Sequence, residues 1–185
     1  MATQFVLQPA ESELQTLADQ YWERSDSHDR EMEREAFEAG AAIRSGEYTL
    51  ANLGAILLWK SERQLDYLIT NGSSAIRRAL EVAANPETST HHAMRALLAL
   101  RGVDLPMAST ILSVIFPEKY IELDYQDLEA LGQRRRDIQF YEEYLAYCRG
   151  LAHRGLVQPQ DELPGPTQLH ALDRALTQWA RNHPE

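Results

Sequence analysis

A glycine interrupts the most apolar helical stretch of this chain, and that interruption constrains the fold more than any other feature. The stretch runs from Leu97 to Leu112, and Gly102 lies inside it. Pro106 follows at a position that suits the first turn of a new helix. Twelve residues after Leu112, a second apolar run ends at Asp124. This order predicts two apolar helices joined by a tight turn, followed by a carboxylate at the end of a hydrophobic segment.

Helical spacing of apolar residues continues through the rest of the sequence. Near the N-terminus, for example, Leu14, Leu17 and Tyr21 recur at intervals of three and four. No run of strand length alternates between apolar and polar residues, so we expect an all-α fold, a multi-helix orthogonal bundle. The expected helices cover approximately residues 14–22, 29–43, 50–60, 65–69, 74–84, 90–100, 106–115, 125–131, 137–152 and 169–179.

The uneven distribution of charge and proline suggests three regions. The net charge is −10, and most of the acidic excess lies in the first 40 residues. We therefore expect an acidic helical extension over 1–45 and a core over 46–157. A proline-rich linker and a last helix that packs on the core follow over 158–185. The acidic helices are expected to be solvated, or to dock on a basic partner or on the core itself.

Bulk composition excludes several classes of protein. The single cysteine, Cys148, rules out an intramolecular disulfide and an iron–sulfur cluster held by four thiolates of this chain. No apolar run is long enough to span a membrane, and the N-terminus does not have the pattern of a signal peptide. We expect a cytoplasmic protein. The acidic balance argues against broad electrostatic attraction to nucleic acid.

The turn around Gly102 has two interpretations. A helix N-terminus offers free N–H groups to an anion, and a glycine lets a phosphate approach them closely. Helical proteins also commonly use glycine simply to end one helix before another begins. The carboxylate downstream, Asp124, favours the first interpretation.

The residues around this turn resemble the helix-hairpin-helix superfamily of DNA glycosylases, which have the 8-oxoguanine glycosylase fold. The chain also resembles a small bacterial branch within that superfamily. The specific match covers roughly residues 57–132. The matching residues are Trp59, Lys60, Ser61, Arg63, Leu100, Gly102, Val103, Ala108, Ile111, Leu112, Asp124, Ala130, Leu131 and Gly132.

The resemblance implies cleavage of the N-glycosidic bond of a damaged or mispaired base in double-stranded DNA. The target nucleotide would be extruded from the duplex before cleavage. Asp124 would stabilise the developing positive charge on the sugar and activate water. Its alternative role is that of an N-cap for the helix at 125–131, and both roles can hold together.

Three positions depart from the family pattern. Pro106 stands where bifunctional members place a Schiff-base lysine, so only a water-using, monofunctional reaction is expected. Asp104 replaces the second hairpin glycine, where it tolerates a left-handed conformation but puts negative charge at the expected phosphate site. Gln126 stands where similar bacterial proteins are expected to carry arginine. A cation bound at the hairpin would offset the charge, but nothing in the sequence supports one.

Further candidates are basic or aromatic. The predicted DNA-binding residues are Arg101, Gly102, Val103, Asp104, Leu105, Arg134, Arg135 and Arg136. For the three consecutive arginines, a solvated turn is the favoured alternative. Tyr120 and Tyr125 flank Asp124 and could stack on an extruded base, although aromatics at such positions more often belong to the core.

The element containing Trp59, Lys60 and Arg63 completes the candidate set. The favoured interpretation of Lys60 is a solvated lysine at a helix end, with its stem against Trp59. The two adjacent histidines, His91 and His92, cannot face one metal from a helix, so no metal site is expected.

Two alternatives to the enzyme remain open. One is a non-catalytic binding or interaction module on the same fold, favoured by Asp104, Pro106, Gln126 and the net charge of −10. The other is an interaction protein whose acidic helices cover the cleft as an autoinhibitory arm.

Overall fold

The chain is helical throughout its described part. The computed structural model describes residues 3–160 and 167–184, and no strand occurs among them. The elements are η1 (Glu11–Glu13), α1 (Leu14–Arg24), α2 (Ser27–Arg44), α3 (Leu50–Lys60), α4 (Glu62–Leu68), α5 (Ser73–Ala83), α6 (Thr90–Leu98), α7 (Leu105–Ile115), α8 (Tyr125–Ala130), α9 (Ile138–His153) and α10 (Gln168–Asn182). The predicted all-α class is confirmed.

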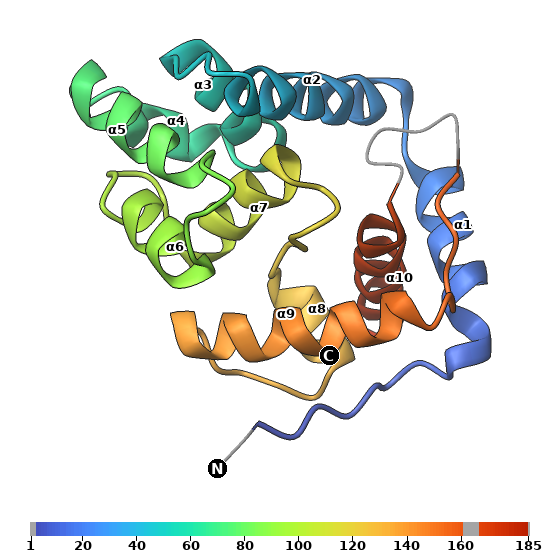
Figure 1. Cartoon of the computed structure of the whole chain (residues 1–185). Helices are drawn as coiled ribbons and strands as arrows, with labels where there is room; N and C mark the ends of the chain where they lie inside the picture. The colour runs from blue at the N-terminus through green and yellow to red at the C-terminus, as the bar shows by residue number, and fades with distance from the viewer. Residues whose placement is uncertain (1–2, 161–166, 185) are drawn as a thin grey trace.

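The helices form two groups (Figure 1). In the first, α2 packs on α3 and α7, α3 on α4 and α7, and α6 on α5 and α7. In the second, α10 packs on α1, α8 and α9. The segment between α7 and α8 passes from one group to the other, and α6 contacts α9 where the groups meet. Asp124 ends this connecting segment.

The acidic N-terminal helices supply part of the core. On α1, Leu14 and Trp22 are buried, and on α2, Ala36 and Ile43 are buried. The two helices belong to different groups, because α1 packs on α10 whereas α2 packs on α3 and α7. Most of their charged residues face outward, as the amphipathic spacing predicts, but Glu33 of α2 is buried.

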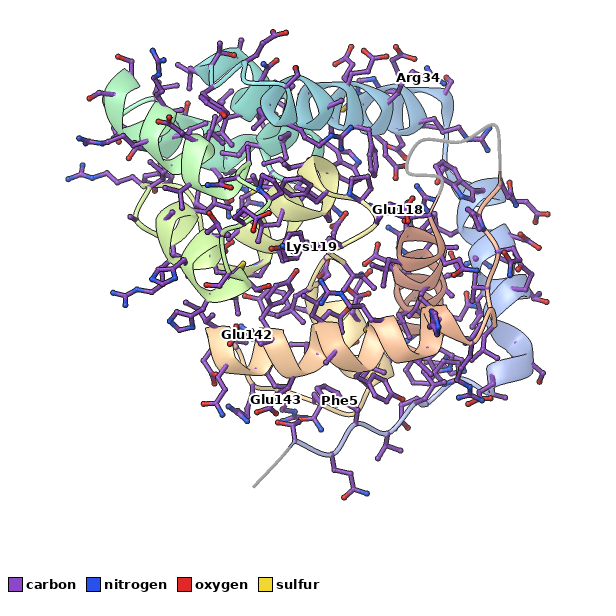
Figure 2. The ribbon with its side chains drawn as sticks, viewed as in Figure 1. Phe5, Arg34, Glu118, Lys119, Glu142 and Glu143 are labelled. Carbon is purple, nitrogen blue, oxygen red and sulfur yellow. The ribbon has the colours of Figure 1, made fainter. Side chains whose placement is uncertain are left out.

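The segment that precedes α1 is also attached to the second group. Val6 and Gln8 donate main-chain hydrogen bonds to the carbonyls of Leu131 and Ala130. The ring of Phe5 lies beneath α9, where it stacks on Tyr147 with centroids 4.9 Å apart (Figure 2).

Among the described residues, no helix has both the length and the apolar character that a bilayer crossing requires. Cys148 is buried in α9 as a free thiol. Most of the predicted proline-rich linker, residues 161–166, lies outside the described part of the chain.

A close helix crossing gives the first prediction. A Cβ placed on Gly40 of α2 would lie 2.2 Å from the carbonyl oxygen of Val114 in α7, which is main chain and cannot turn away. We expect Gly40→Ala to push the two helices apart and to lower the free energy of unfolding by about 1–3 kcal/mol. Chemical denaturation measures this change.

Gly150 provides the matched control for this substitution. It also lies within a helix, α9, but a Cβ there would meet nothing within 4 Å. Gly150→Ala should raise the free energy of unfolding by about 0.5–1 kcal/mol, because alanine restricts the unfolded chain. Equal effects of both substitutions would contradict the close approach of α2 and α7.

Candidate functional site

The segment that leads from α7 to Asp124 is fixed by buried side chains. Tyr141 and Tyr144 of α9 donate their hydroxyls to the carbonyls of Ile121 and Glu122, at 2.9 and 2.8 Å. Ser109 of α7 accepts a hydrogen bond from the Leu123 N–H at 2.8 Å. The main chain immediately before Asp124 is therefore held between helices of both groups.

Asp124 combines a fixed main chain with a carboxylate that caps α8, as predicted. Its N–H donates to Asp127 Oδ2 at 2.9 Å, and the two residues form a capping box. Oδ1 of Asp124 also accepts from the Gln126 N–H at the long distance of 3.4 Å. A carboxylate has about four acceptor sites, so this half-buried group retains capacity for a ligand.

Two pockets meet at Asp124. The first, called here the turn-side pocket, has a volume of 230 Å³. Its lining residues are Lys60, Ser61, Gln64, Asp104, Pro106, Met107, Thr110, Glu122, Leu123, Asp124 and Tyr125. The second, the acidic-helix pocket, has a volume of 310 Å³ and is lined by residues of α1, α2, α3, α8 and α10 together with Asp124. The predicted candidates Lys60, Asp104, Asp124 and Tyr125 are therefore brought together by the fold.

Lys60 ends α3 beside Trp59 and is partly exposed, as expected, but it also takes part in an ion pair that was not predicted. Its Nζ forms an ion pair with Glu122, whose side chain is only 4% exposed, and lies 4.4 Å from the ring centroid of Trp59. Thr110 Oγ1 donates to the same carboxylate at 3.2 Å. Burial by itself lowers the pKa of Lys60, but the charge of the paired Glu122 carboxylate and its hydrogen bond outweigh that effect and raise it. Lys60 is therefore an ammonium ion at neutral pH.

Four buried charged or ionisable residues, Glu33, Asp127, Asp173 and Arg174, are described here as one polar cluster, and Glu33 also lines the acidic-helix pocket. Arg174 of α10 donates to Glu33 of α2 at 2.6 Å, and both side chains are buried. This ion pair links the first group of helices to the second. Burial is the main cause that raises the pKa of Glu33, while the neighbouring Arg174 guanidinium lowers it.

Two further carboxyls of the cluster have raised pKa values. Asp127 accepts from Asp124 N and from Thr177 Oγ1, the latter at 3.1 Å. Burial, reinforced by the Asp124 carboxylate, raises the pKa of Asp127 to about 8. Burial and the neighbouring Asp127 raise the pKa of Asp173 well above its ordinary value. Both carboxyls therefore favour the protonated form in the folded state.

The raised pKa of Asp127 predicts how stability depends on pH. In the unfolded chain an aspartate titrates near pH 3.9, so between pH 4 and 8 the folded state binds more protons than the unfolded state. This contribution to stability is complete below pH 4 and is lost as the pH rises through 8. We expect Asp127→Asn to remove about 1 kcal/mol of the fall in unfolding free energy between pH 7 and 9.

Denaturation at several pH values measures this difference. Asp137→Asn is the matched control, because Asp137 also caps a helix but is exposed, and its pKa is lowered, chiefly by the N–H of Phe140. Asp137→Asn should show the same fall in unfolding free energy between pH 7 and 9 as the wild type. An Asp127→Asn profile parallel to wild type would show that Asp127 is already ionised at pH 7.

The turn at Gly102 is packed closely against α4. Gly102 has φ of +85°, and a Cβ there would lie 2.7 Å from the carbonyl oxygen of Gln64. The conformation and the close approach both require glycine. The Asn71 side chain holds the same turn through two hydrogen bonds to the main chain of Arg101. It accepts from the Arg101 N–H at 3.0 Å and donates to the Arg101 carbonyl at 2.9 Å.

Asp104 does not adopt the left-handed conformation that this position of the hairpin would allow. Its φ is −95° and its backbone is extended. The carboxylate caps α7 by accepting from the Met107 N–H at 3.0 Å. Gln64 Nε2 lies 3.4 Å from the other carboxylate oxygen. The chain's own carboxylate therefore occupies the N-terminus of α7, where an external phosphate was considered.

The remaining predicted residues of the turn differ in accessibility. The side chains of Val103 and Leu105 are buried in the core, so these residues can offer a ligand only their main chain. Arg101 is exposed. Pro106 lies in the first turn of α7, as predicted.

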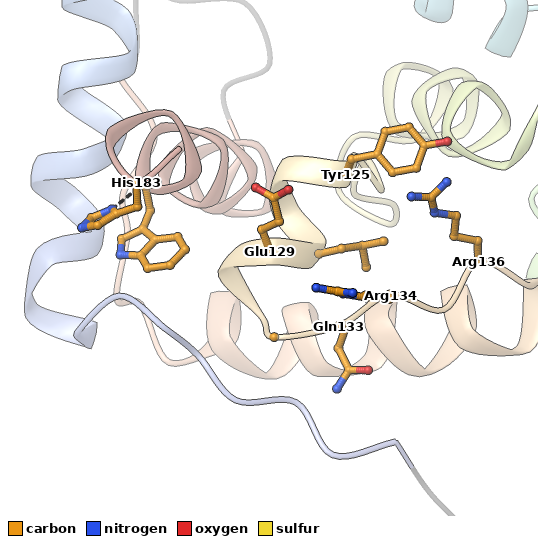
Figure 3. A pocket seen from close by; sticks show the side chains of 9 residues that line it. Tyr125, Glu129, Gln133, Arg134, Arg136 and His183 are labelled. Atoms are coloured by element: carbon orange, nitrogen blue, oxygen red, sulfur yellow. Dashed lines mark hydrogen bonds between the residues drawn. The ribbon is translucent and has the colours of Figure 1, made fainter. Parts of the chain in front are cut away.

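The three consecutive arginines lie in different surroundings. Arg135 donates to Asp137 and to Thr3 Oγ1, so it anchors the N-terminal segment. Arg134 and Arg136 line a third pocket of 530 Å³ beside α8 (Figure 3). We call it the arginine pocket. The guanidinium of Arg136 lies 3.6 Å from the ring centroid of Tyr125, which lines both this pocket and the turn-side pocket.

The aromatic candidates also differ from one another in exposure to solvent. Tyr120 is 1% exposed and belongs to the core, so its burial prevents it from stacking on an extruded base. Tyr125 is 45% exposed beside Asp124 and remains a stacking candidate. Trp59 lines the acidic-helix pocket, whereas Arg63 is exposed on α4 and lines neither pocket that meets at Asp124.

Several site residues were not predicted. Glu122 had a usable signal, because a charged residue within the apolar run before Asp124 requires a buried partner. Gln64, Asp127 and Asp173 carry no such signal, since their roles depend on contacts between distant helices. Among the residues that the structure describes, no group of three or more His, Cys, Asp or Glu could hold a metal ion.

Comparison of the chain with protein-family models, curated proteins and solved structures finds no significant match.

Proposed function

We propose that this protein is a monofunctional DNA N-glycosylase that hydrolyses the N-glycosidic bond of a damaged or mispaired base. The observation that carries the proposal is the position of Asp124. Its main chain is held by Asp127, and its carboxylate caps α8 where two pockets meet. A carboxylate so placed can stabilise an oxocarbenium-like sugar and accept a proton from the attacking water.

We further propose that α6, the Gly102 turn and α7 form a helix-hairpin-helix motif within an orthogonal bundle. The positive φ of Gly102 and the short connection between two apolar helices support this assignment. In this proposal the exposed Arg101 and the arginine pocket contact the DNA backbone, because guanidinium groups pair well with phosphates.

The chemistry of the turn-side pocket favours water over an amine nucleophile. Pro106 carries no amine, and Lys60 is held as an ammonium ion by Glu122. An attacking amine must be neutral, so neither residue provides one. The single thiol and the absence of paired cysteines suit a reducing compartment, and we place the protein in the cytoplasm.

Base release from defined duplexes tests the proposal. The purified full chain is incubated with duplexes that each carry one deaminated, oxidised, alkylated or mispaired base. We expect release of the free base from at least one duplex, leaving a strand that breaks only after alkali treatment. Absence of release from every duplex would overturn the proposal.

A non-catalytic binding module on the same fold is the second candidate. The observation that favours it is the carboxylate of Asp104, which caps α7 where a phosphate would approach. This candidate predicts little affinity for DNA at physiological salt. Tight binding that weakens steeply with salt would exclude it, because such a dependence reports phosphate contacts.

A further inference from the structure

Gln64, which lines the turn-side pocket, carries a hydrogen-bond acceptor without a partner. Gln64 Oε1 is closed to solvent and accepts no hydrogen bond from any described residue. The amide orientation is supported by its other end, since Nε2 faces the carboxylate of Asp104 and only the NH₂ group can donate to it. A buried acceptor without a donor costs free energy, so Gln64 Oε1 would gain from a donor group of a ligand in the adjacent pocket.

The Gln64 amide is also free to turn toward a ligand. Its contact with Asp104 is 3.4 Å long and therefore weak, and the terminal torsion of a glutamine side chain has a broad energy minimum. A small rotation can present Oε1 to the pocket with little loss. Asp104 retains its bond from the Met107 N–H during such a rotation.

Lys60 supplies the opposite polarity in the same pocket. Its ammonium carries three donors and no acceptor, and Glu122 does not use all three. A charged donor forms a stronger hydrogen bond to a carbonyl oxygen than a neutral donor does. After the rotation of the Gln64 amide, the pocket would offer a ligand one acceptor, Gln64 Oε1, and one strong donor, Lys60 Nζ.

Size restricts the ligand further. The volume of 230 Å³ is below the range of about 300–1,000 Å³ that holds drug-sized molecules. Met107 and Leu123 provide apolar lining, and Tyr125 provides an exposed aromatic ring. These features suit one planar heterocycle.

We propose that the turn-side pocket binds a nucleobase through a lactam edge, in which Gln64 Oε1 accepts the ring N–H and Lys60 Nζ donates to the adjacent carbonyl. This inference rests on the proposed function, since it assigns the class of base that Asp124 would release. Uracil and hypoxanthine carry this edge. Adenine presents an unprotonated ring nitrogen at the corresponding place, which repels the Gln64 oxygen.

Binding of deoxynucleosides, in which the sugar blocks the other ring N–H group, tests the inference without requiring hydrolysis. The Gln64 side-chain NH₂ signals of the full chain are followed by NMR during titration with deoxyuridine, deoxyinosine, deoxyadenosine, 3-methyldeoxyuridine and 1-methyldeoxyinosine. We expect the two lactams to shift these signals, whereas their N-methylated forms and deoxyadenosine do not. Deoxyadenosine binding as tight as the lactams, or no response to any probe at its solubility limit, would overturn the inference.

Two variants assign the preference to Gln64, with affinities measured by calorimetry. Gln64→Leu keeps the approximate volume but removes the acceptor, so lactam binding should weaken about threefold to tenfold and the preference over N-methylated bases should disappear. Gln139→Leu, on the exposed start of α9, is the matched control and should bind like wild type. A preference that survives in a folded Gln64→Leu variant, as verified by its melting curve, would contradict the role of Gln64.

The two proposals fail in different ways. If lactams bind through Gln64 but no base is released from any duplex, the pocket assignment stands and the hydrolase proposal falls. If bases are released with no dependence on Gln64, the hydrolase stands and the lactam assignment falls.

Discussion

Asp124→Asn should reduce the single-turnover rate of base release by about 10²- to 10⁴-fold, the usual contribution of a positioned acid–base group. An amide accepts no proton from water and carries no charge to stabilise the sugar cation. It can still cap α8 through its carbonyl oxygen. Melting temperature and affinity for the substrate duplex should therefore remain close to those of wild type.

Glu81→Gln is the matched control for this substitution. Glu81 is also a carboxylate on a helix, but it is exposed on α5 and lines neither the arginine pocket nor the two pockets that meet at Asp124. It should release base at the wild-type rate. An equal loss in both variants would point to a general effect of charge on DNA binding. Undiminished release by Asp124→Asn would remove Asp124 from the chemistry.

Lys60→Met should lower the free energy of unfolding by about 3 kcal/mol, measured by chemical denaturation at pH 7. The substitution leaves Glu122 almost completely buried without its cation, and an unpaired buried charge is strongly destabilising. The partial exposure of Lys60 puts the expected loss at the low end of the usual range of about 3–5 kcal/mol. Thr110 alone cannot replace the ammonium ion.

The double variant Lys60→Met, Glu122→Gln separates loss of the pair from loss of packing. Because the glutamine is neutral and can still accept from Thr110, the double variant should recover most of the stability lost in Lys60→Met. The exposed pair of Arg154 and Glu11 provides the control, and its removal should change stability little. No recovery in the double variant would mean that Lys60 stabilises the fold mainly through its contact with Trp59.

The secondary structure was largely predictable because each helix carries its own pattern. The helix after the Gly102 turn begins at Leu105, where Asp104 and Pro106 are both favourable start residues. The packing was less predictable. Gly40 occurs among alanines in an acidic helix, and its sequence context gives no sign of the close contact with Val114.

The candidate site was predictable in its parts but not in its interactions. Asp124, Lys60 and Tyr125 were singled out individually, and the fold places all three around the turn-side pocket. The pairing of Lys60 with Glu122 joins positions far apart in sequence, which local spacing cannot indicate. Tyr120 follows the alternative that was favoured for aromatic residues beside Asp124, since it is buried in the core.

The acidic helices also require a different test from simple deletion. Removing residues 1–45 would expose the parts of the core that α1 and α2 cover, including the surfaces against Leu14 and Ile43. Loss of function after such a truncation would therefore report unfolding. Substitution of exposed acids such as Glu31 and Glu35 tests an autoinhibitory role without disturbing the core.

Single-turnover base release combined with borohydride trapping tests the hydrolytic role of Asp124 most directly. The wild-type chain is mixed with the duplex that it processes fastest, and free base, strand breaks and covalent protein–DNA adducts are measured in parallel. For the wild-type chain we predict release of the base, an intact strand with an abasic site and no trapped adduct. The release of the base should depend on Asp124. A borohydride-trapped adduct, or release that persists in Asp124→Asn, would contradict it.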